Sequence, residues 1–92
     1  MSLAPYETEL VGRWEMVQGR MVEDEASRRI KKLVREELKS VAKASNGWDS
    51  LFRDPADGRL WELTYPSSEL QGGGPPTLRV MSEEAAHKKY GF

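Results

Sequence analysis

The chain has 92 residues, of which 32% are charged and 38% hydrophobic, and its formal net charge is −1. This length accommodates one hydrophobic core, so we expect a single domain over residues 1–92, with residues 1–8 flexible. Three Trp, three Tyr and two Phe are too many for a disordered chain. The lack of cysteine excludes disulfides, thiolate catalysis and cysteine-ligated metals, and a single histidine argues against any other transition-metal site.

No stretch of the sequence has the pattern of a membrane span, because the uncharged run Leu70–Leu78 is rich in Gly and Pro. The first five residues, Met1–Pro5, lack the apolar run of a signal peptide. We therefore expect a cytoplasmic protein that does not bind a membrane.

The first predicted element is a strand or a hairpin, because β-forming residues flank a tight turn. The two extended segments are Arg13–Val17 and Arg20–Val22, and the turn between them is Gln18-Gly19.

Residues 24–47 have the pattern of one long amphipathic helix, with Asp24 as its N-cap and Asn46-Gly47 at its end. Its apolar positions recur at spacings of three and four: Ala26, Ile30, Leu33, Val34, Leu38, Val41 and Ala42. A stripe of basic residues follows on the opposite side: Arg28, Lys32, Arg35, Lys39 and Lys43. This stripe is either a solvated helix face or a binding surface.

After Gly47 the pattern changes to that of strands. Trp48–Arg53 and Arg59–Tyr65 are predicted to pair as a hairpin around the loop Asp54–Gly58, and Leu78–Met81 is a last short strand. A short C-terminal helix over Ser82–Gly91 begins with a serine cap. The predicted fold is a small α+β sandwich, in which one long amphipathic helix packs on a four-stranded, mostly antiparallel sheet.

Residues with possible chemistry do not form a coherent catalytic set. The three glycines Gly72–Gly74 precede two prolines instead of the helix and lysine of a phosphate loop. His87 lies in the predicted C-terminal helix without a nucleophile motif, and Glu62 and Glu69 lack a second chemical partner for acid–base catalysis. We therefore predict a protein that is not an enzyme, with no catalytic residue, no cofactor and no metal site.

Nucleic-acid binding is the alternative function, with the basic helix 28–43 following phosphates and the tryptophans stacking on bases. The arrangement of one strand argues against the second part of this hypothesis. Trp61, Leu63 and Tyr65 alternate on one strand face, which is typical of residues that point into a core. We therefore do not expect nucleic acid as the partner.

From Leu10 to its C-terminus the chain resembles the bacterial immunity protein 27 family, the antidotes encoded beside toxins of polymorphic toxin systems. The resemblance is carried by Glu9–Trp14, Gly47-Trp48, Asp54–Arg59, Trp61–Pro66 and Gly72–Pro76. It implies a small α+β intracellular protein that binds a cognate toxin domain and blocks it by occlusion. It does not identify the toxin, the binding surface or the oligomeric state.

We predict the partner-binding face where the strand end Tyr65-Pro66 meets the loop Gly72–Pro76. Three glycines cost conformational entropy on folding, and two following prolines offset part of that cost, which suggests that the shape of the loop matters. A structural role, in which the glycines let the chain pass close to Trp61, is equally compatible with the sequence. The predicted partner-binding residues are Glu62, Tyr65, Glu69, Gly72, Gly73 and Gly74.

Overall fold

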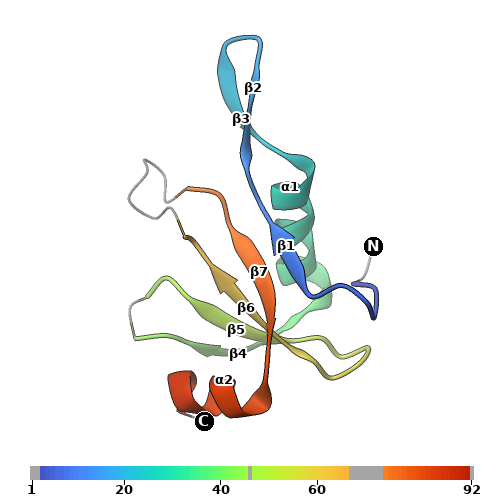
Figure 1. Cartoon of the computed structure of the whole chain (residues 1–92), viewed down its shortest axis with the longest axis vertical. Coiled ribbons are helices and arrows are strands. Elements are labelled where there is room, and N and C mark those ends of the chain that lie inside the picture. The colour runs from blue at the N-terminus through green and yellow to red at the C-terminus, as the bar shows by residue number, and fades with distance from the viewer. Residues whose placement is uncertain (1–2, 46, 67–73, 92) are drawn as a thin grey trace.

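The computed structural model describes residues 3–45, 47–66 and 74–91. Its main element is a five-stranded antiparallel sheet with the strand order β1-β7-β6-β5-β4. The strands are β1 (Glu9–Val11), β4 (Lys39–Lys43), β5 (Ser50–Arg53), β6 (Leu60–Thr64) and β7 (Thr77–Met81). A separate hairpin, here called the arm, consists of β2 (Trp14–Val17) and β3 (Arg20–Glu23). The arm projects from one end of the molecule, opposite β4 (Figure 1).

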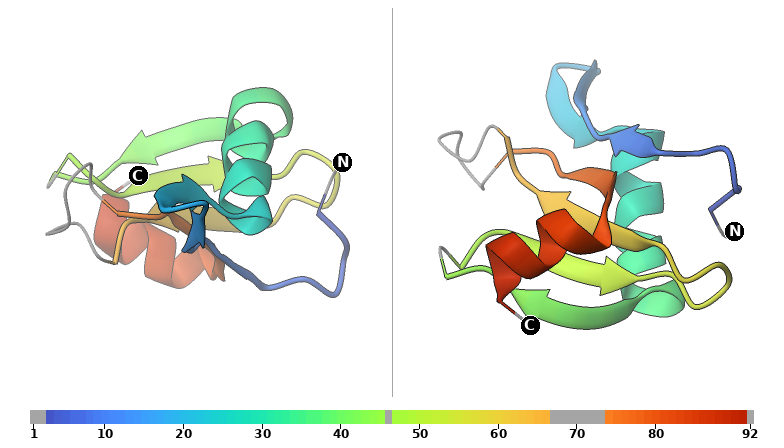
Figure 2. Two further views of the ribbon diagram at one scale, coloured as in Figure 1. Left: turned by 90° about the horizontal axis from the view of Figure 1, so that it is seen from above. Right: turned by 60° about the horizontal axis from the view of Figure 1, so that its bottom comes forward.

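Two helices lie on opposite faces of the sheet, α1 (Glu25–Lys32) on one and α2 (Glu83–Tyr90) on the other (Figure 2). Under α1, a cluster of buried side chains forms the larger core: Leu3, Ile30, Leu33, Leu38, Phe52, Trp61, Leu63 and Leu78. Under α2, Leu51, Leu60 and Ala86 form a smaller one. Trp61 and Leu63 are buried on the α1 face and Tyr65 packs against the same cluster, which confirms the predicted core-facing row.

The α+β class and the antiparallel sheet are confirmed, but the predicted number of strands is wrong. The sheet has five strands, not four. The segment predicted as the first strand forms the arm, and Glu9–Val11, for which no strand was predicted, pairs with β7 instead. The local turn chemistry agrees with prediction, since both Gln18 and Gly19 at the tip of the arm have positive φ.

The predicted long helix is also wrong. α1 begins at the Asp24 cap as expected, but it ends after Lys32 and passes through one wide π-turn, η1 (Leu33–Glu37), before the chain becomes extended at Leu38. Residues 39–43 then form the strand β4, whose register shifts between Ser40 and Ala42. Such a bulge interrupts the two-residue alternation of apolar and polar side chains that is typical of a strand. The apolar residues at 38, 41 and 42 therefore fit a helix face as well.

Residues 3–8, part of the segment 1–8 for which flexibility is expected, make specific contacts with the rest of the fold. Leu3 is buried, and the Arg59 guanidinium donates to the backbone carbonyls of Ala4 and Glu7. The Glu7 carboxylate accepts two hydrogen bonds from Arg29 of α1, at 2.6 and 2.7 Å. These hydrogen bonds from Arg29 lower the pKa of Glu7 from 4.5 to about 2.

Glu7→Gln is expected to reduce the free energy of unfolding by about 1–2 kcal/mol at pH 7, because it removes a charge-assisted, bidentate pair. The folded-state pKa of Glu7 lies below its unfolded value, so its stabilisation is present above pH 4.5 and is lost as the pH falls towards 2. Urea unfolding of both proteins between pH 7 and pH 2 measures this. A difference that does not shrink below pH 4.5 would show that the charge of Glu7 is not what stabilises the segment.

Within residues 3–45, 47–66 and 74–91, no helix is both long and apolar enough to cross a membrane.

Candidate partner-binding surface

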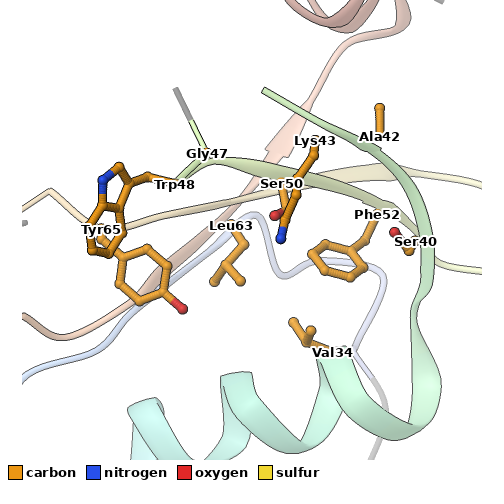
Figure 3. Close-up of a pocket in the computed structure, with 10 residues that line it drawn as sticks. All are labelled: Val34, Ser40, Ala42, Lys43, Gly47, Trp48, Ser50, Phe52, Leu63 and Tyr65. Atoms are coloured by element: carbon orange, nitrogen blue, oxygen red, sulfur yellow. The ribbon is translucent and has the colours of Figure 1, made fainter. Parts of the chain in front are cut away.

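A hollow of about 580 Å³ opens between the sheet and the end of the α1–η1 segment, next to the outer strand β4 (Figure 3). We call it the edge pocket. It is lined by Val34, Ser40, Ala42, Lys43, Gly47, Trp48, Ser50, Phe52, Leu63 and Tyr65. One side of the pocket is formed by Val34 of η1, just before the chain becomes extended at Leu38.

The edge pocket has an apolar floor and an exposed aromatic wall. Phe52 and Leu63 at its floor are 7% and 9% exposed, whereas Trp48 is 51% exposed. The Trp48 ring meets the Tyr65 ring edge to face, with 5.9 Å between centroids. An exposed tryptophan held by a second ring is typical of the anchors found at protein–protein interfaces.

Positive charge borders the edge pocket. Lys43 extends over the pocket, with its ammonium group between Leu63 and Phe52 in the view of Figure 3. Lys39 lies at the other end of the same strand, one residue before the pocket-lining Ser40 and therefore on the opposite face of the sheet. Neither lysine makes an ion pair with any residue in the described part of the chain, in contrast to Lys31 and Lys89, which contact carboxylates.

The arm is a second exposed apolar surface. Met16 and Met21 pair across its two strands and are 65% and 55% exposed, and Val17 and Val22 are also exposed. A smaller hollow of about 330 Å³ at the base of the arm is lined by Val11, Gly12, Arg13, Trp14, Met21, Pro66, Pro75 and Thr77. Flexible methionines suit surfaces that adapt to a partner.

One comparison with known proteins identifies a family. The sequence model of immunity protein 27 matches residues 16–82, which is more than two thirds of the chain. The chain belongs to the immunity protein 27 family. A search of curated proteins and a search of solved structures found no match.

The matched region of this immunity protein 27 family member contains all of the edge pocket and most of the arm. Membership confirms the resemblance expected from the sequence, and immunity proteins are in general toxin-neutralising rather than catalytic. In the described residues no group of three or more His, Cys, Asp or Glu side chains is placed to hold a metal ion. His87 is exposed on α2.

The predicted site residue Glu62 lies on the α2 face of the sheet. Its carboxylate accepts a hydrogen bond from the Tyr90 hydroxyl at 2.7 Å and contacts the Lys89 ammonium at 2.5 Å. Burial, together with the bond to Glu62, raises the pKa of Tyr90, and hydrogen bonds to Asp49 and Glu62 raise that of Lys89. The side chain of Glu62 is only 15% exposed, so these internal contacts occupy it.

Two of the predicted site residues, Glu62 and Tyr65, lie on opposite faces of the sheet. Tyr65 lines the edge pocket on the α1 face, three residues and one face away from Glu62. Gly74 is buried and has φ +73°, a left-handed conformation that favours glycine. Glu69, Gly72 and Gly73 lie outside the described residues.

The predicted basic stripe is also divided. Arg28 and Lys32 lie on α1 and Arg35 on the π-turn, whereas Lys39 and Lys43 lie on β4. Some of these charges are used internally, since Arg28 donates to the backbone carbonyl of Glu23 and Arg35 contacts Glu36. A continuous helical surface over residues 28–43, which the nucleic-acid hypothesis needs, is therefore not present.

The sequence did not predict Trp48 and Lys43 as neighbours in a surface site. A sequence signal was present in part, because Trp48 directly follows Gly47, which ends the preceding predicted element. Lys43 could not be placed beside it while residues 39–43 were assigned to a helix.

Proposed function

We propose that this protein neutralises a cognate bacterial toxin domain by binding it and covering its active surface, without catalysis of its own. The observation that carries the proposal is the family match over residues 16–82. The exposed Trp48 of the edge pocket and the exposed methionines of the arm support it, because inhibition by occlusion needs a surface that desolvates well. We further propose that the protein acts in the cytoplasm of the bacterium that carries the polymorphic toxin system.

Co-expression tests this function. The reading frame beside the gene is expected to encode a large secreted protein with a variable C-terminal toxin domain. Cells that make this domain alone should stop growing, and cells that also make the present chain should grow normally. The two purified proteins should co-elute in gel filtration.

Two controls make the growth assay specific. An immunity protein of another family should not rescue growth, and a frameshifted copy of this chain should not either. Failure of the intact chain to rescue growth, together with separate elution of the two proteins, would contradict the proposed function.

A further inference from the structure

The outer strand β4 has an unpaired backbone edge. It is the last strand of the sheet and pairs only with β5 among the described residues. The amide of Ala44, just after β4, donates to the Asp49 carbonyl at 2.9 Å. Because successive amides of an extended chain point to opposite sides, the Lys43 amide points away from β5. A free edge of this kind is a template for a further strand.

The edge pocket lies directly beside this free edge. Ser40, Ala42 and Lys43 of β4 are part of its lining. A strand added to β4 would run about 4.8 Å from it, and every second side chain would point to the α1 face of the sheet. A side chain on this face would lie beside Lys43 and point towards the hollow that Trp48 and Phe52 line.

The lysines on β4 favour a partner segment with negative charge. Lys39 and Lys43 lie at the two ends of the strand and make no ion pair within the described part of the chain. Edge lysines and a bulge also protect a sheet against aggregation, and that role alone would explain both features of β4. It does not explain why a 51% exposed tryptophan lines the pocket next to this edge.

We propose that β4 binds an extended, acidic segment of the partner protein. In this complex the segment hydrogen-bonds to the backbone of β4, and an apolar side chain enters the edge pocket towards Trp48. A carboxylate on the pocket face pairs with Lys43, and a carboxylate on the opposite face pairs with Lys39. The inference rests on the proposed function, in that the segment belongs to the toxin domain.

Affinity measurements with the toxin domain from the growth assay, made by cell-free synthesis and immobilised, test this interface. Trp48→Ala is expected to weaken binding at least about 30-fold, as for a central aromatic anchor. Lys43→Glu is expected to weaken it at least about 10-fold through charge repulsion. Arg20→Glu makes the same charge change at the tip of the arm and should stay within about threefold of the parent.

The backbone contact is tested by comparing two substitutions at one position. Lys43→Ala removes the charge and keeps the outward amide, whereas Lys43→Pro removes both. The Lys43→Pro variant is expected to bind the toxin domain at least about 10-fold more weakly than the Lys43→Ala variant. Melting temperatures of both variants, measured without the toxin, show whether the fold is retained. If the Lys43→Pro variant does not fold, hydrogen exchange of the parent protein tests the backbone contact instead. The amides of residues 39–43 should exchange more slowly in the complex than in the free protein.

Three outcomes separate the inference from the proposed function. If the parent binds the toxin domain and Trp48→Ala and Lys43→Glu bind within threefold of it, the β4 interface is wrong and the function stands. If Met21→Asp abolishes binding while those two variants do not, the arm is the interface and the inference is overturned. If the parent itself neither binds nor rescues growth, the proposed function has failed.

Discussion

Trp61→Ala is expected to lower the free energy of unfolding by about 3–5 kcal/mol, the range for truncating a buried aromatic side chain. Trp61 is fully buried in the larger core, and the Arg59 guanidinium lies 4.9 Å from its ring centroid. A domain of this size has a total stability of roughly 5–15 kcal/mol, so the variant should be partly unfolded at 37 °C. Urea unfolding followed by circular dichroism measures the loss.

Trp48→Ala is the matched control for this prediction, because it makes the same chemical change at a half-exposed position. Its cost should be about 1 kcal/mol or less, most of it from the lost contact with the Tyr65 ring. Equal destabilisation by the two substitutions would mean that Trp61 is not the centre of the core. The same control shows that any loss of toxin binding by Trp48→Ala is not a loss of fold.

Gly12→Ala is expected to destabilise the fold by about 1–3 kcal/mol, the usual cost of overpacking. A Cβ atom at Gly12 would lie 2.5 Å from the Pro76 carbonyl oxygen and would overlap the Ser27 hydroxyl. The Gly12 amide donates to that same carbonyl at 2.8 Å, so the two backbones cannot separate without losing a hydrogen bond. Thermal unfolding of the two proteins measures the effect.

A double-mutant cycle with Ser27→Ala identifies the source of the strain at Gly12. Ser27→Ala removes the hydroxyl but leaves the Pro76 carbonyl in place, so it should restore only part of the stability lost by Gly12→Ala. Complete recovery would show that the side chain, not the backbone, limits the space. If Gly12→Ala alone is as stable as the parent, the close approach of Gly12 to Pro76 is contradicted.

The candidate site depends on which face of the sheet each side chain of β6 points to, and the sequence pattern predicts only part of this. Alternation along β6 and into the next residue places Tyr65 with Trp61 on the α1 face, and the sequence predicted that row correctly. The same alternation puts Glu62 on the opposite face, where Lys89 and Tyr90 occupy it. Nothing near Glu62 in the sequence indicates these partners, because they come from a helix that begins about twenty residues later.

The sequence by itself determined the elements whose cause is local. The arm follows from Gln18-Gly19, the β5–β6 hairpin from the loop that ends at Gly58, and the two helix starts from Asp24 and Ser82. Each depends on a backbone conformation or a capping hydrogen bond within a few residues.

Only the tertiary structure decided that α1 ends at Lys32 and that residues 39–43 form a strand. Leu51 and Phe52 of β5 are buried on the two faces of the sheet, and β5 gains a hydrogen-bonded neighbour when β4 pairs with it. That gain depends on residues distant in the sequence, and the bulge makes the spacing of apolar residues in β4 fit a helix equally well. The edge pocket and the free edge beside it exist because this tertiary pairing outweighed local helix periodicity.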